Sequence, residues 1–228
     1  MINKLVIIGV SETAERILRF CEFYQLYDVV GFAVDARYRK SSTFYGKPVW
    51  DLEALDLHID RKEVFVFIAL FWNHLNGDRR RLYERVCKLG FQFANIISPK
   101  ASIRGSVGVN CWVMDYSVVQ EGAVIENNVI LADNALIGHL SHVESHCFIG
   151  AKSTIMGGCT IGEQAFVGVG ATVFENLCIG KKSIIGACTI AKQDIPDFSV
   201  LRINDPNVIC KQYTEQEMES KMVANFRR

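Results

Sequence analysis

Three of the chain's five histidines, His139, His142 and His146, lie within eight residues in the segment IGHLSHVESHCFIG. An imidazole titrates near neutral pH, so a histidine can serve as a general base. Three imidazoles that converge on one point can instead hold zinc, at about 2.1 Å from each nitrogen. Spacing alone does not separate a base, a metal site and surface residues of a repeat. Which of these roles applies depends on the structural elements that carry the histidines.

The composition narrows the class of protein. The chain has 228 residues, of which 50% are hydrophobic, so it can bury a full core. Its 25 basic residues balance its 25 acidic ones, which argues against a broad nucleic-acid surface. No apolar run predicts a membrane span or signal peptide, and the eight cysteines lack the paired spacing of a disulfide framework. We expect a cytoplasmic, reduced protein without membrane or nucleic-acid partners.

The first part of the chain alternates strand and helix patterns. Short apolar runs typical of strands buried on both faces occupy residues 4–10, 28–35 and 63–70, and amphipathic helical patterns occupy 11–25 and 77–90. This order predicts an α/β domain with a small Rossmann-like parallel sheet over residues 1–95.

The ends of the first two predicted strands carry polar residues where such sheets bind ligands. The candidates for substrate binding are Gly9, Ser11, Glu12, Asp35, Ala36 and Arg37. Asp35 can accept a hydrogen bond from a base or ribose, and Arg37 can pair with a phosphate. Of the three glycines in the dinucleotide-binding motif G-x-G-x-x-G, only Gly9 is present. A plain α/β domain without a ligand is therefore an alternative.

From residue 107 to residue 190 the sequence repeats every six positions. Every hexad begins with Val, Ile or Leu, and its fifth residue is Ala, Ser, Cys or Thr except at Val129 and Leu177. A helix of 3.6 residues per turn cannot keep this period, which is typical of a parallel β-helix. We expect the β-helix to span residues 96–195, with three hexads per coil, and a tail with a short helix over residues 196–228. Cys111, Cys147 and Cys159 fall in the small-residue column and are expected to fill the core.

Counting by eighteen predicts which residues stack on one another. Glu121 falls one coil below His139, about 4.8 Å away along the stack. A carboxylate there can hold one nitrogen of the imidazole and leave the other free as a base. The alternative is that Glu121 is a solvated surface residue with no role in the chemistry. Glu144 is a second, less direct candidate. His142 and His146 fall in two other columns, so the three histidines do not converge and no metal site is predicted.

The glycines of the repeat suggest where an extended ligand could lie. Gly150, Gly168 and Gly186 are spaced by one coil, and Ala151 and Ala187 follow two of them. A strip without side chains lets a ligand such as pantetheine contact backbone amides. The alternative is that these glycines only ease the turn at the corner.

The segments IGHLSHVESHCFIG, IGEQAFVGVGATV and IAKQDIPDFSVLRINDPNV resemble the left-handed β-helix acyltransferases of the sialic-acid O-acetyltransferase-like family. That family includes nucleotide-sugar N-acetyltransferases of the bacillosamine pathway. The chain departs from relatives at Leu140, where they often carry an acidic residue, and at Phe148, where many carry a second histidine.

The resemblance implies a left-handed β-helix, a homotrimer whose active site lies between subunits, and His139 as the catalytic base. It also implies acetyl-CoA along the coils, with candidate contacts at Gly150, Ala151, Gly168, Gly170, Gly186, Ala187 and Lys192. Backbone N–H groups near Gly157 or Gly158 are candidates for receiving the oxyanion.

The expected function is acetyl transfer from acetyl-CoA to the amine of a nucleotide-linked sugar in surface-glycan (lipopolysaccharide) biosynthesis. A sugar O-acetyltransferase is the alternative within the class. Alternatives of other classes are a zinc hydratase like the γ-class carbonic anhydrases and a non-catalytic scaffold that binds nucleotide sugars.

Overall fold

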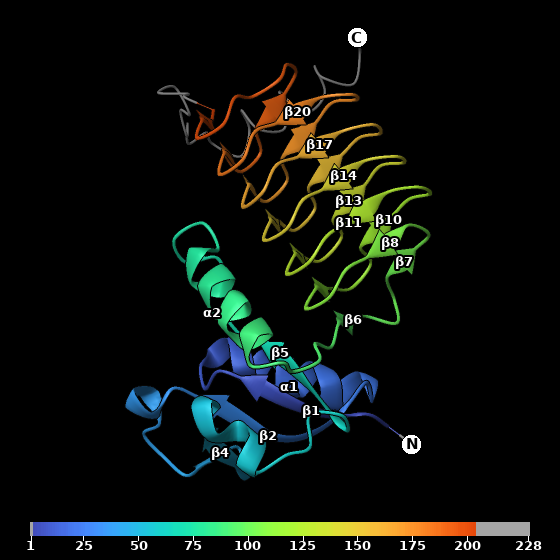
Figure 1. Ribbon diagram of the computed structural model, residues 1–228. Helices are drawn as coiled ribbons and strands as arrows, with labels where there is room; N and C mark the ends of the chain where they lie inside the picture. Colours follow the sequence, from blue (N-terminus) through green and yellow to red (C-terminus); the bar gives the residue numbers. More distant parts are fainter. Residues whose placement is uncertain (1, 204–228) are drawn as a thin grey trace, which may run out of the picture.

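The computed structural model describes residues 2–203 and divides into an amino-terminal α/β domain and a β-helix (Figure 1). The α/β domain contains β1 (Lys4–Ile8), α1 (Glu12–Tyr24), β2 (Asp28–Val34), η1 (Ala36–Tyr38), β3 (Thr43–Phe44), β4 (Lys47–Asp51), η2 (Leu52–Leu57), β5 (Val64–Ile68) and α2 (Gly77–Lys88). Its sheet has the order β3-β4-β2-β1-β5. The pairs joining β4, β2, β1 and β5 are parallel, and β3 is antiparallel to β4, so the sheet is mixed.

The α/β domain forms where the apolar patterns predict it. Leu5, Val6, Ile7 and Ile8 of β1 are at most 1% exposed, as expected of a central strand covered on both faces. Helix α1 buries Ala14, Ile17, Leu18 and Cys21, which recur at helical spacing and pack on the sheet. The β3–β4 hairpin, which the periodicity did not predict, widens the sheet at one edge.

The β-helix has three faces. The first face contains β7 (Ser102–Ile103), β10 (Val118–Val119), β13 (Leu136–Ile137), β16 (Thr154–Ile155), β19 (Thr172–Val173) and β22 (Ile190–Ala191). The second face contains β8 (Ser106–Val107), β11 (Val124–Ile125), β14 (His142–Val143), β17 (Thr160–Ile161) and β20 (Cys178–Ile179). The third, which we call the docked face, contains β6 (Ile96–Ile97), β9 (Trp112–Val113), β12 (Ile130–Leu131), β15 (Phe148–Ile149), β18 (Phe166–Val167), β21 (Ile184–Ile185) and β23 (Val200–Leu201).

The predicted register of eighteen residues per coil is confirmed. Val118 pairs with Leu136, which pairs with Thr154, which pairs with Thr172. The branched residues that begin the hexads point inward: Val119, Ile137, Ile155 and Val173 stack in the core at 0% exposure. The last described strand, β23, lies within the segment expected as a tail, and the predicted carboxy-terminal helix lies outside the described residues.

The amino-terminal domain packs on the docked face. Trp112, Ile130 and Phe148 point outward from this face yet are nearly buried, because they share an apolar cluster with α1 and the end of β5. Phe148 stacks on Phe166 with ring centroids 4.9 Å apart. Phe148 therefore has a packing role at the domain interface. None of the helices described over residues 2–203 is long and apolar enough to cross a membrane.

Candidate active site

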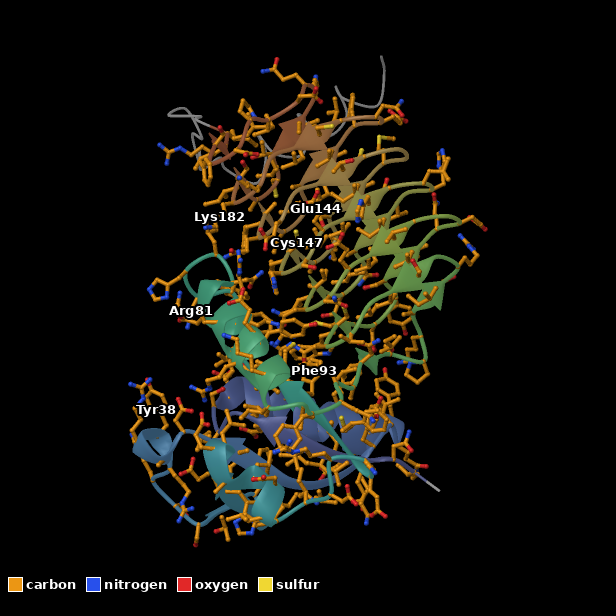
Figure 2. The ribbon with its side chains drawn as sticks, in the orientation of Figure 1. Tyr38, Arg81, Phe93, Glu144, Cys147 and Lys182 are labelled. Atoms are coloured by element: carbon orange, nitrogen blue, oxygen red, sulfur yellow. The ribbon has the colours of Figure 1, made fainter. Side chains whose placement is uncertain are left out.

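A cavity of about 670 Å³ lies at the carboxyl ends of β1 and β2. Four of the six predicted substrate-binding residues line it: Gly9, Ser11, Asp35 and Arg37. Glu12 and Ala36 are exposed and do not line it. The structure adds residues that the sequence did not single out, among them Tyr38 and, from α2, Asp78, Arg81, Leu82 and Arg85. Figure 2 labels two of these lining residues, Tyr38 and Arg81, at the left of the view. We call the cavity the nucleotide pocket, after the ligand that the sequence predicts at these strand ends.

Ion pairs fix the charged groups of the nucleotide pocket. The Asp35 carboxylate accepts from both terminal nitrogens of Arg85 and lies 3.8 Å from Nη2 of Arg37. Hydrogen bonding to Asp35 raises the pKa of Arg85 above its ordinary value. Asp78 forms an ion pair with Nη2 of Arg81. The pocket thus presents three guanidinium groups against two carboxylates, a balance that suits a phosphate-bearing ligand.

Gly9 is required by a close approach of two strand ends. Its φ is +136°, and a Cβ there would lie 3.2 Å from both the Cβ and the carbonyl oxygen of Ala69. The Gly9 N–H donates to the Ala33 carbonyl at 2.8 Å. A side chain at this position would strain the backbone and force apart the segments that follow β1 and β5, which contribute Val10 and Leu70 to the lining of the pocket.

His139 lies at the corner between the first and second faces. It is exposed, its backbone N–H donates to Oε1 of Gln120 at 2.9 Å, and its ring lies over Gly157 of the next coil. A Cβ at Gly157 would come within 2.2 Å of Cε1 of His139. Gly157 therefore leaves the space that the imidazole occupies. The Gly158 N–H donates to the His139 carbonyl at 2.8 Å, so it is not free to receive an oxyanion.

Glu121 lies one coil below this corner, as the count by eighteen predicts. Its backbone carbonyl accepts from Leu140 at 3.1 Å, whereas its carboxylate pairs with Nε of Arg104 at 2.8 Å. Within residues 2–203, no hydrogen bond joins the Glu121 carboxylate to His139. Glu144 lies at another corner, between the second face and the docked face, and its carboxylate accepts from the backbone N–H of Glu163 at 2.8 Å.

The other two histidines have partners of their own. Nε2 of His142 lies 2.8 Å from Oε1 of Glu126, and the second Glu126 oxygen accepts from the N–H and hydroxyl of Ser145. These contacts with Ser145 and His142 lower the pKa of Glu126 against the opposing effect of its partial burial. His146 is 6% exposed, and its Nδ1 lies 2.8 Å from Nδ2 of Asn128. Among the described residues, no group of three or more His, Cys, Asp or Glu could hold a metal ion.

Lys192 follows β22, at the corner between the first and second faces, whereas the other six predicted acetyl-CoA contacts lie along the corner between the docked face and the first face. Gly150, Gly168 and Gly186 stack there in one column, Ala187 and Lys192 are exposed, and Ala151 is half-buried. A Cβ at Gly150 would lie 2.7 Å from the Val169 nitrogen of the next coil, so these glycines have a packing reason of their own. Gly170 turns the corner with φ +67°.

The nucleotide pocket and His139 lie on different sides of the chain. The pocket is lined only by residues of the α/β domain, which covers the docked face. His139 projects from the corner opposite that face. Within the described chain, no hydrogen bond or ion pair connects His139 to the α/β domain.

Known proteins share the repeat and the fold. The family model "Bacterial transferase hexapeptide (six repeats)" matches residues 141–175. The structure superimposes on perosamine N-acetyltransferase from Caulobacter crescentus, solved with CoA and GDP-perosamine, with a TM-score of 0.74 and 26% identity over 88% of this chain and 93% of that one. The acetyltransferase domain of PglB from Neisseria gonorrhoeae gives a TM-score of 0.76 at 24% identity over 89% and 97%. WeeI from Acinetobacter baumannii gives 0.73 at 18% identity over 88% and 96%.

These matches confirm the predicted fold class. The chain is a left-handed parallel β-helix of hexapeptide repeats preceded by a small α/β domain, and its resemblance to the β-helix acyltransferases holds over most of its length.

Proposed function

We propose that the chain is an acetyltransferase that moves the acetyl group of acetyl-CoA to the amine of a nucleotide-linked amino sugar in glycan biosynthesis. The perosamine enzyme, whose fold the chain shares over 88% of its length, was solved with CoA and a GDP-linked amino sugar. The observation that carries the proposal within this chain is the combination of the arginine-lined nucleotide pocket with an exposed histidine on a hexapeptide β-helix.

His139 is the base in this reaction. The sugar amine attacks the thioester carbonyl, His139 accepts the proton that the nitrogen loses, and the carbon–sulfur bond breaks to give the amide and CoA thiolate. The thiolate then takes up a proton. A well-placed general base typically contributes about 10²–10⁴-fold to the rate.

The orienting group of His139 is Glu121 in our proposal. It lies one coil below and is paired with Arg104, an exposed ion pair that costs little to exchange. Rotation of Glu121 from Arg104 to the imidazole would raise the histidine's pKa, because a nearby carboxylate favours imidazolium. Glu121→Gln should therefore lower kcat about tenfold and lower the acidic pKa of the rate profile.

The active chain is a homotrimer in our proposal. Because the nucleotide pocket faces away from its own His139, a sugar held by one chain needs the His139 of another. The predicted acetyl-CoA corner and the His139 corner lie at the two edges of the first face, so a neighbouring chain packed beside that face could complete both. Light scattering should give three times 25.7 kDa, and a monomer at micromolar concentration would contradict the shared site.

The reaction takes place in the cytoplasm in our proposal. The seven described cysteines are all unpaired, as expected in a reducing compartment.

Thiol release tests the proposed activity. The chain is incubated with acetyl-CoA and a panel of UDP-, dTDP- and GDP-linked 4-amino sugars, with the matching 4-hydroxy sugars as controls. We expect an amino sugar to accelerate CoA release and its hydroxy counterpart to leave the background unchanged. Release with the hydroxy sugars alone would make the chain an O-acetyltransferase, and no release with either set would refute the proposal.

A further inference from the structure

Three buried polar residues stack beside α2, along the corner between the second face and the docked face. Asn110, Asn128 and His146 occupy the same position in successive coils, with φ of 57°, 61° and 67°. Their exposures are 0%, 0% and 6%. We call these three residues the corner ladder. Polar groups buried this deeply need hydrogen-bond partners, and the ladder supplies them internally.

A backbone amide sets the direction of every hydrogen bond in the ladder. The Ile68 N–H, at the end of β5, donates to Oδ1 of Asn110 at 3.0 Å. Nδ2 of Asn110 then donates to Oδ1 of Asn128 at 2.6 Å, and Nδ2 of Asn128 faces Nδ1 of His146 at 2.8 Å. The Ile68 N–H can only donate, so turning either amide around would place donor against donor or acceptor against acceptor. Nδ1 of His146 must therefore accept, which leaves the proton of the neutral ring on Nε2.

The surroundings of His146 also favour the neutral ring. Burial, followed by the charge of Arg80, lowers its pKa to about 4. Arg79 acts in the same direction, and Glu84 and Glu126 oppose it.

The ladder is bonded to the start of α2. Nδ2 of Asn76 donates to the His146 carbonyl at 2.6 Å. Arg79, which is fully buried, donates to the Asn110 carbonyl at 2.7 Å and to the Leu70 carbonyl at 3.0 Å, and also to the Ile68 carbonyl. One coil further, Arg80 donates to Oε1 of Gln164 at 2.7 Å. These contacts fix one side of α2 against the β-helix.

The opposite side of α2 forms a wall of the nucleotide pocket. Asp78, Arg81, Leu82 and Arg85 line the pocket and recur at helical spacing, between the residues that bind the ladder. Leu70, whose carbonyl Arg79 holds, lines it as well. The same helix therefore contacts the ladder on one side and the pocket on the other.

We propose that the corner ladder positions the α2 wall of the nucleotide pocket, with His146 as a positioning residue held in its Nε2–H form by the Ile68 amide through Asn110 and Asn128. This deepens the proposed function and rests on it for the identity of the pocket's ligand. Breaking the ladder should weaken the binding of nucleoside diphosphates and leave CoA binding unchanged, because the predicted CoA corner lies at another edge of the β-helix.

A matched pair of variants tests the ladder. Asn128→Leu removes both side-chain hydrogen bonds of the middle residue. Asn134→Leu makes the same change at an exposed corner with nearly the same backbone, φ 59°, and Leu140 shows that leucine is accommodated at such a corner, with φ 55°. The dissociation constants of UDP, GDP, dTDP and CoA are measured by calorimetry, and hydrogen exchange of the Ile68 amide is followed in parallel.

Asn128→Leu should weaken nucleoside diphosphate binding roughly tenfold, within the range of coupling through packed networks, and accelerate exchange at Ile68. Asn134→Leu should change neither. Faster exchange at Ile68 with undiminished nucleotide binding would overturn the positioning role. Failure of all three diphosphates to bind the unaltered chain would instead refute the proposed substrate class.

Asn128→Asp gives a second test that keeps the shape of the residue. The new carboxylate has no N–H to donate, so Nδ1 of His146 must take up a proton to keep the hydrogen bond. Nitrogen NMR should show the Nε2–H form of His146 in the unaltered chain and a ring protonated at Nδ1 in the variant. An Nδ1–H form in the unaltered chain would overturn the ladder's direction, whatever the ligand of the pocket.

Discussion

Acid should destabilise the folded chain through His146, and the structure sets the size of the effect. The folded chain protonates His146 only near pH 4, because burial lowers its pKa to about 4 from an ordinary value of 6.5. Between these values the unfolded chain binds a proton that the folded chain does not, so unfolding takes up a proton and falling pH favours it. The contribution of the neutral, buried His146 to the free energy of unfolding is complete above about pH 6.5 and is lost as the pH falls towards 4. The difference corresponds to about 3 kcal/mol in the free energy of unfolding.

Urea titrations at about pH 7.5 and pH 4.5 measure this effect. His146→Gln is the matched variant, because Gln164 occupies the same corner position one coil further with φ 59°. Buried or paired carboxylates such as Glu126 also lose stabilisation in acid, but they do so in both chains. The unaltered chain should therefore lose about 2.5 kcal/mol more than the variant between the two pH values. Equal losses in the two chains would refute the neutral, buried state of His146.

Three further substitutions test the proposed site. His139→Asn should lower kcat by about 10²–10⁴-fold while CoA still binds, and a variant with full activity would remove His139 from the chemistry. Gly157→Ala should displace the His139 ring and lower kcat about tenfold with little change in CoA affinity, whereas unchanged kcat would show that the ring is not used where it lies. Asp35→Ala removes the carboxylate that can accept from the base or ribose and that holds Arg85 and Arg37 in place, so the KM for the nucleotide sugar should rise more than the KM for acetyl-CoA. Equal changes in the two KM values would remove Asp35 from the nucleotide pocket.

The repeat made much of the fold predictable. A period of six fixes which residues point inward and which stack, so the placement of Glu121 one coil below His139 and the separation of the three histidines followed from counting. The ends of β1 and β2 likewise marked Gly9 and Asp35, because ligand sites of parallel sheets gather at such ends.

The choice of side-chain partner was not predictable. Counting places Glu121 within reach of the next coil, but it does not say that the carboxylate pairs with Arg104. The His142–Glu126 pair depends on a glutamate side chain that reaches from the end of one strand to the strand of the next coil, and no spacing rule selects it. The packing of α2 against His146 depends on how two domains sit together, with Asn76 seventy positions earlier in the chain. Such contacts carry no periodic signal.

A subunit-mixing experiment tests the central claim, that the nucleotide pocket of one chain works with the His139 of another. His139→Asn removes the base, and Ser11→Trp fills the pocket at an exposed position whose side chain makes no capping hydrogen bond. Each variant alone should be inactive. Refolded together in equal amounts, they should regain about a quarter of the unaltered activity, since one interface in four then joins an intact pocket to an intact histidine. A mixture as inactive as its parents would place both parts of the site in one chain and contradict the account.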